Sequence, residues 1–219
     1  MLFVNFKTYK ESSGFKALDL LEKIEEASHE TQIKVIAVVQ AADVREATIS
    51  SELEVWAQHV DPVEYGAHTG AVIPEAVVAD GAMGTFLNHS ENRFKNFSDL
   101  ESAVKRAKEV KLKTLIFAGD LKELKKVLKL KPDFVSYEPP ELVGSKKTSV
   151  AKAKPKVIKE AVKIAHDARI PLIVGAGIKS KKDVEISVKL GADGVAVASD
   201  IVKAKDPKKE TLELLEGFE

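Results

Sequence analysis

The chain has 219 residues, which is long for one ordinary domain but within the length that α/β barrels reach as single domains. Its 34 Lys and Arg residues balance 34 Asp and Glu residues, so it lacks the basic excess of a general nucleic-acid or membrane-surface binder. Cys is absent, which excludes disulfides and thiolate metal sites and fits a reducing compartment. The start MLFVNFK has no leader pattern and no segment approaches the length of a transmembrane span, so we expect a cytoplasmic protein.

Short apolar runs and amphipathic stretches alternate along the whole chain. The apolar or β-branched runs predict strands at residues 2–6, 33–38, 53–57, 84–87, 114–117, 134–137, 172–174 and 194–197. The amphipathic stretches predict helices at residues 14–28, 43–49, 74–80, 98–110, 121–130, 155–168, 181–190 and 207–215. Continuous apolar strands, each followed by a helix, indicate a parallel sheet that is buried on both faces.

The number of strand–helix units distinguishes two α/β architectures. Eight units close a barrel, whereas a doubly wound sheet usually needs fewer units and a Gly-rich turn after its first strand. Here the first strand is followed by Asn5-Phe6-Lys7, without a G-x-G-x-x-G pattern. We therefore predict an α/β fold with a single (β/α)8 barrel domain over residues 1–219, with no linker or second domain.

A carboxylate, Glu138, ends the sixth predicted strand and precedes Pro139, Pro140 and a loop about a dozen residues long. Parallel α/β folds place a catalytic base and its lid at such a position, and loops of this length are often functional. The alternative interpretation is a solvated Glu before a turn. These residues alone do not decide between the two.

Other chemically active side chains are predicted at the same mouth of the barrel, where the carboxyl ends of the strands converge. These are Asn5 and Lys7, then Asn88, His89, Ser90 and Glu91, then Glu138, Gly175, Ala176, Gly177, Ala198 and Ser199. A lysine, a histidine and a carboxylate together indicate proton transfer with a developing negative charge. The Gly-rich backbone after strand seven and the turn after strand eight are where such barrels hold a phosphate. No cluster has metal-ligand spacing, so no metal is expected.

Motifs along the whole chain resemble the triosephosphate isomerase family in its shorter archaeal form. They are, in order, NFKTY, AQHVDPVEYGAHTG, LNHSENR, YEPPELVG, GAGI and GVAVASDIVKAKDP. HSE and EPPELVG, each at a predicted strand end, are the most specific of these. The resemblance implies a TIM barrel that interconverts dihydroxyacetone phosphate and glyceraldehyde 3-phosphate through an enediolate, without a cofactor.

The resemblance also implies roles for individual residues. Glu138 is expected to be the general base, and His89 a neutral electrophile whose pKa is lowered by the N-terminus of the following helix. Lys7 is expected to bind substrate and offset the enediolate charge. Asn5 is expected to hold substrate or to orient Lys7. Without the resemblance, His89 would be interpreted as a structural histidine, Lys7 as a solvated lysine and Asn5 as a turn residue.

Further contacts with the substrate follow from the same resemblance. We expect Phe6, Val143, Ser145, Gly177, Ala198 and Ser199 to bind substrate, with its phosphate on the backbone N–H groups of the last four. Ser90 and Glu91 are expected to support the catalytic side chains, with Glu91 near Lys7; helix capping is their simpler interpretation.

Three positions depart from the family pattern. The loop 144–150 is one residue longer than expected and carries Lys146 and Lys147. Asp200 replaces the usual Gly or Ala beside the phosphate site, and Ala118 replaces a frequent Cys. Two alternatives therefore stay open: another phosphate-binding barrel enzyme, such as a phosphoribosyl isomerase or a thiamine-phosphate synthase, or a barrel without catalytic activity.

The third loop, residues 64–70, resembles the family's interdigitating loop, so we expect a homodimer in which Thr69 reaches toward the partner's active site. We expect no tetramer, because the helices at 98–110 and 121–130 present charged outer faces. Their predicted outward residues are Glu101, Lys105, Arg106, Lys108, Glu109, Lys122, Glu123, Lys125, Lys126 and Lys129. No nucleic-acid or membrane partner is expected.

Overall fold

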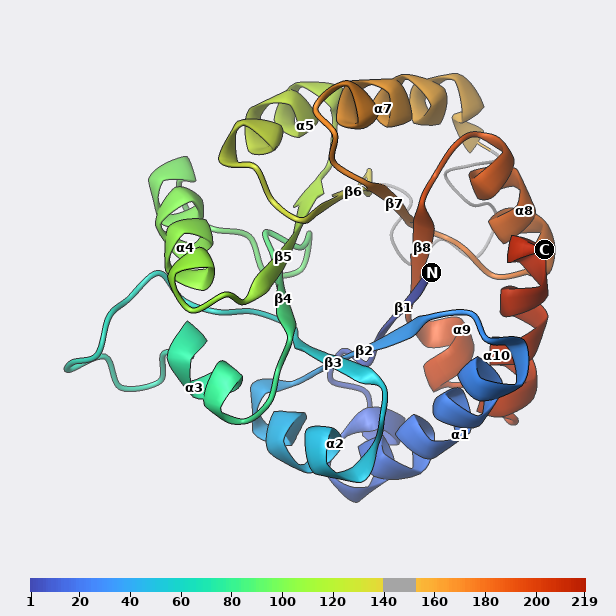
Figure 1. Ribbon diagram of the computed structural model, residues 1–219, viewed down its shortest axis with the longest axis horizontal. Coiled ribbons are helices and arrows are strands. Elements are labelled where there is room, and N and C mark those ends of the chain that lie inside the picture. The colour runs from blue at the N-terminus through green and yellow to red at the C-terminus, as the bar shows by residue number, and fades with distance from the viewer. Residues whose placement is uncertain (140–152) are drawn as a thin grey trace.

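The computed structural model describes residues 1–139 and 153–219, which form a closed barrel of parallel strands (Figure 1). The strands pair in chain order, and β8 closes the sheet against β1. They are β1 (Leu2–Asn5), β2 (Val35–Val39), β3 (Glu54–Ala57), β4 (Gly84–Leu87), β5 (Lys113–Ala118), β6 (Phe134–Tyr137), β7 (Leu172–Gly175) and β8 (Gly194–Val197). The predicted (β/α)8 barrel is confirmed.

Helices surround the sheet (Figure 1). They are α1 (Phe15–Thr31), α2 (Val44–Ser50), α3 (Pro74–Ala79), α4 (Phe97–Glu109), α5 (Leu121–Val127), α7 (Pro155–Asp167), α8 (Lys181–Lys189), α9 (Ser199–Val202) and α10 (Pro207–Leu215). Short 3-10 turns include η3 (Leu128–Leu130), which continues α5. Within the described residues, no helix is long and apolar enough to cross a membrane.

The core has two layers because each strand is buried on both faces. One layer lies between the sheet and the helices, where the apolar helix faces pack. The other fills the barrel interior, where aromatic rings pack edge to face; Phe3 and Trp56 have ring centroids 5.3 Å apart. Gly84 is required here, because a Cβ at this position would lie 2.2 Å from the Trp56 ring. Because side chains fill the barrel interior, a site is expected at the carboxyl end of the barrel, where barrels of this fold carry their active sites.

Side-chain caps begin the helices that follow β4, β5 and β7. The side chains of Asn96, Asp120 and Ser180 accept the backbone N–H groups of Asp99, Glu123 and Asp183. Each cap satisfies one N–H at the start of its helix. Since these helices start at the barrel mouth, the caps hold the loops that carry the candidate site.

Two residues predicted on the outer helix faces lie elsewhere. Arg106 reaches from α4 to α3, where its guanidinium pairs with Glu75, and its side chain is only 15% exposed. Glu123 is in the first turn of α5 and faces the barrel mouth, because helical side chains tilt toward the N-terminus of their helix. The other eight predicted outward residues are exposed.

Candidate active site

A cavity at the carboxyl end of the barrel brings most of the predicted site residues together. Asn5, Lys7, His89 and Glu138 line one side, and Gly177, Ala198 and Ser199 line the other. Val143 and Ser145, with Lys146 and Lys147, lie outside the described residues.

Phe6 does not line this cavity. Its side chain is fully buried in the layer between the sheet and the helices, its N–H donates to Val38 O at 3.0 Å, and its carbonyl accepts from Ser12. The expected substrate contact from Phe6 is therefore contradicted. The reason is the alternation of side chains along β1, which directs Phe6 away from the barrel interior.

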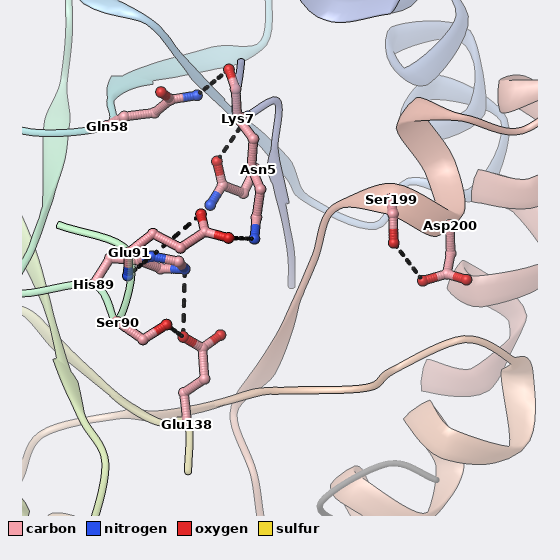
Figure 2. Close-up of polar contacts among 9 residues, drawn as sticks. All are labelled: Asn5, Lys7, Gln58, His89, Ser90, Glu91, Glu138, Ser199 and Asp200. Atoms are coloured by element: carbon pink, nitrogen blue, oxygen red, sulfur yellow. Dashed lines mark hydrogen bonds and ion pairs between the residues drawn. The ribbon is translucent and has the colours of Figure 1, made fainter. Parts of the chain in front are cut away.

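Lys7 has a left-handed backbone, with φ 49°. Its N–H donates to Asn5 Oδ1 at 3.0 Å, and its carbonyl accepts from Gln58 Nε2 at 3.0 Å. These two bonds hold a conformation that costs a non-glycine residue roughly 1–3 kcal/mol. The ammonium Nζ donates to Glu91 Oε1 at 2.7 Å, as Figure 2 shows. Asn5 orients the backbone of Lys7, and Glu91 orients its charge.

The imidazole of His89 is held in one tautomer. Its Nδ1 accepts the N–H of Glu91 at 3.1 Å, so in the neutral ring Nε2 carries the proton. Nε2 lies 3.3 Å from Glu138 Oε2. Burial, followed by the nearby Lys7 charge, lowers the pKa of His89 to about 4, although Glu91 opposes the shift. A neutral Nε2–H donor therefore faces the cavity near pH 7.

The N–H that donates to Nδ1 belongs to a turn at Ser90–Glu91. It does not belong to the N-terminus of a following helix, as predicted, because α4 begins only at Phe97. The predicted low pKa of His89 agrees with the structure, but its main cause is burial. A turn and a helix N-terminus offer the same backbone donor, and sequence patterns near a strand end do not separate them.

Glu138 follows β6 and is only 8% exposed. Burial raises the pKa of its carboxyl group to about 7, against the opposing effects of Lys7 and of the Ser90 hydroxyl, which donates to Oε2 at 3.3 Å. The N–H of Glu138 donates to Ala118 O at 2.9 Å. In Figure 2 the carboxylate points toward His89 and Ser90. Such a carboxyl group suits a base that works near neutral pH.

The opposite end of the cavity is lined by the backbone that follows β7 and β8. Ala176 and Gly177 have φ values of 134° and 70°, and Ser199 begins α9. The carboxylate of Asp200 is paired with the Ser199 hydroxyl at 3.4 Å and lies apart from the Lys7, His89 and Glu138 side chains in Figure 2. Lys179, half-buried, lines the same end and supplies a positive charge there.

One group of described side chains has the spacing of metal ligands. It consists of Glu25, His29 and Glu52, which are largely exposed and do not line the cavity that holds Lys7. The cavity itself brings His89 and Glu138 together with Lys7, and Asp200 and Lys179 also line it. A histidine and a carboxylate beside a lysine suit proton transfer better than metal binding.

Sequence reasoning missed Gln58, Glu123 and Lys179. A signal existed for Gln58, which directly follows β3 and so stands at the barrel mouth like Lys7 and His89. Lys179 lies beyond the GAGI motif at the end of β7, where a similar search would have found it. Glu123 is in a helix with outward-facing lysines, and no periodicity distinguishes it from them.

Known proteins resemble this chain along nearly its whole length. A family model described as Triosephosphate isomerase matches residues 1–216. Curated relatives named triosephosphate isomerase occur in Methanothermus fervidus and Metallosphaera sedula; both are 42% identical, covering 98% and 99% of this chain and 97% and 95% of their own lengths. A relative of the same name from Saccharolobus solfataricus is 42% identical over 210 residues, covering 95% of this chain and 92% of its own.

Proposed function

The chain belongs to the triosephosphate isomerase family, and we propose that Glu138, His89 and Lys7 carry the chemistry of that family's reaction. The reaction is the reversible interconversion of dihydroxyacetone phosphate and D-glyceraldehyde 3-phosphate, a step of glycolysis and gluconeogenesis. No finding favours a different phosphate-binding enzyme or a barrel without catalytic activity. The whole chain, residues 1–219, is taken as one catalytic domain.

Glu138 acts as the base. Its carboxylate takes a proton from the hydroxymethyl carbon of dihydroxyacetone phosphate, and the electron pair forms a carbon–carbon double bond while the carbonyl oxygen becomes anionic. The protonated Glu138 returns the proton to the former carbonyl carbon, and the hydroxyl proton moves to the neighbouring oxygen, which leaves an aldehyde. A pKa of about 7 supports this role, because the carboxyl group can both accept and return a proton near neutral pH.

His89 and Lys7 stabilise the enediolate. The Nε2–H of neutral His89 donates a hydrogen bond to the oxygens on which charge develops, and a buried donor of this kind is more effective than one in water. The Lys7 ammonium, oriented by Glu91 at 2.7 Å, offsets the negative charge. Asn5 holds Lys7 in its left-handed conformation.

The substrate phosphate occupies the end of the cavity formed by Gly177, Ala198 and Ser199. Val143 and Ser145, outside the described residues, belong to the same proposal by resemblance. The positive φ of Gly177 and the start of α9 support an anion site here. The reaction as proposed needs no cofactor and no metal.

The proposed assembly is a homodimer through the loop around Thr69. This loop, between β3 and α3, projects from the barrel (teal in Figure 1), and Tyr65 within it is 76% exposed. A cavity of about 600 Å³ beside Lys7 and His89, lined by polar residues such as Gln58 and Asp61, offers a place for the partner's loop. We propose that the protein is located in the cytoplasm and that it binds neither nucleic acids nor membranes.

The observation that carries the proposed function is the 3.3 Å separation of His89 Nε2 and Glu138 Oε2 in the cavity that Lys7 also lines. The test is a coupled assay of the purified protein with D-glyceraldehyde 3-phosphate, in which dihydroxyacetone phosphate is reduced by an added dehydrogenase. We expect D-glyceraldehyde 3-phosphate to be converted only when this protein is added. No turnover by folded protein, at any substrate concentration, would contradict the proposal.

A further inference from the structure

Glu123 connects two loops at the barrel mouth. Its Oε2 accepts the N–H of Gly119 at 2.8 Å, and its Oε1 accepts the Asn88 amide at 3.0 Å. The Arg93 guanidinium contacts both oxygens. A Glu at this helix position ordinarily bonds back to the N–H of its own N-cap residue. Here it instead joins the loop after β5 to the loop after β4.

Asn88 transmits this connection to the residue that follows it, His89. Asn88 is 6% exposed and has a left-handed φ of 59°, which Asn tolerates better than most residues. Its Nδ2 donates to Phe117 O at 3.1 Å as well as to Glu123. Because both partners are acceptors, the amide has one orientation, and the backbone that leads into His89 is fixed with it.

The end of β5 lies against both proposed catalytic side chains. The Phe117 ring contacts the His89 ring edge to face, with centroids 4.8 Å apart. The Ala118 carbonyl accepts the N–H of Glu138 at 2.9 Å. Glu123 binds the next residue, Gly119, so one carboxylate holds the short segment that contacts the base and the electrophile.

We propose that Glu123 is a positioning residue for the isomerisation. It fixes Asn88 and Gly119, and through them the direction in which His89 Nε2 points. The proposal rests on the roles proposed above for His89 and Glu138. A displacement of a catalytic group by about 1 Å can cost on the order of 10²-fold in rate. Glu123 does not line the cavity, so its loss affects the chemical step more than substrate binding.

The experiment compares kcat and KM of Glu123→Ala and Glu123→Gln with the wild type, with Glu101→Ala as control because Glu101 is exposed on α4. We expect kcat of Glu123→Ala to fall about 10- to 100-fold with KM within about twofold. Glu123→Gln recovers part of the loss, since its carboxamide oxygen still accepts from Asn88. A Glu123→Ala protein that stays folded at the assay temperature with wild-type kcat overturns the proposal.

A double-mutant cycle separates positioning from general destabilisation. Asn88→Gly removes the amide but keeps the left-handed backbone without strain. If the two residues act along one path, the double variant has a kcat no lower than about half that of the slower single variant, whereas independent losses multiply. Multiplied losses overturn the proposed path. An inactive wild type would instead refute the proposed function, because the positioning role is tested only against wild-type turnover.

Discussion

Burial moves the pKa values of His89 and Glu138 in opposite directions, to about 4 and about 7, and in both cases it favours the neutral form. For His89 the neutral form is the hydrogen-bond donor that the proposed mechanism uses. For Glu138 the raised pKa gives the carboxylate a higher proton affinity than an exposed Glu has. The ionised form of Glu138, which is the active form in the proposed mechanism, is therefore the form that burial destabilises.

This conflict predicts a pH-dependent gain of stability in Glu138→Gln. The folded-state pKa of about 7 lies above the ordinary Glu value of 4.5, so folding takes up a proton between these pH values. The contribution of Glu138 to stability is full below about pH 4.5 and is lost as the pH rises through about 7. The neutral variant has no such loss. We expect Glu138→Gln to gain about 3 kcal/mol over the wild type between pH 4.5 and pH 8.

Denaturant unfolding of both proteins at pH 5 and pH 8 measures this difference, with the exposed pair Glu101 and Glu101→Gln as control. An equal stability difference at both pH values would show that burial does not govern the Glu138 carboxyl group.

At the residue scale, sequence patterns predicted the position of side chains that stand at a strand end. Lys7, His89 and Glu138 were located this way, and the cavity brings them together. It failed for Glu123, because the direction of a long side chain depends on its neighbours in space and not on helical periodicity. It also failed for Phe6, for which family resemblance outweighed the alternation of side chains along β1.

At the scale of elements, the end of β7 makes room for the side chain of Glu138, which directly follows β6. A Cβ added at Gly175 would lie 3.0 Å from Glu138 Oε1 and 3.0 Å from Ser136 Oγ. Ser136 is fully buried, and Glu138 is buried except where it lines the cavity, so an added Cβ would push the Glu138 carboxylate out of its present position. The absence of a side chain at Gly175 therefore belongs to the geometry of the site.

Gly175→Ala is predicted to lower kcat about tenfold by displacing the Glu138 carboxylate, since small displacements of a reacting group are costly. KM changes less, because the phosphate end of the cavity is untouched. Steady-state kinetics together with thermal unfolding check this. An active Gly175→Ala protein with unchanged kcat would mean that the carboxylate has more freedom than its packing indicates.

Most elements were predictable because a buried parallel strand and an amphipathic helix each have a clear hydrophobic period. The boundaries differ by only a few residues. β2 begins at Val35 instead of 33, and the helix predicted at 121–130 ends as α5 at Val127 and continues as η3. Contacts between helices, such as the ion pair of Arg106 with Glu75, were not predictable. The hydrophobic periodicity of a helix shows which face is buried, but it does not show which residue of another helix a side chain will contact.

At the scale of the whole molecule, we predict a homodimer that does not form a tetramer. The outer faces of α4 and α5 expose Lys105, Lys108, Lys122, Lys125 and Lys126, and burying such charges in an interface core is unfavourable. The inward positions of Arg106 and Glu123 remove two charges from these faces. The face of α4 still carries Glu101, Lys105, Lys108 and Glu109, and the face of α5 still carries its three exposed lysines. Light scattering after size exclusion at micromolar protein should give the mass of two chains of 23.9 kDa. A mass near four chains would contradict the charge argument, and a single chain would contradict the proposed role of the Thr69 loop.

The most direct test of the proposed mechanism is the kcat of Glu138→Gln in the coupled assay, with Glu101→Gln as control. Gln keeps the size and burial of the side chain but cannot accept the proton. We predict a fall in kcat of about 10²–10⁴-fold, as expected for the loss of a general base, with the fold retained and the control unaffected. A well-folded Glu138→Gln protein that turns over at the wild-type rate would contradict the assignment of Glu138 as the base.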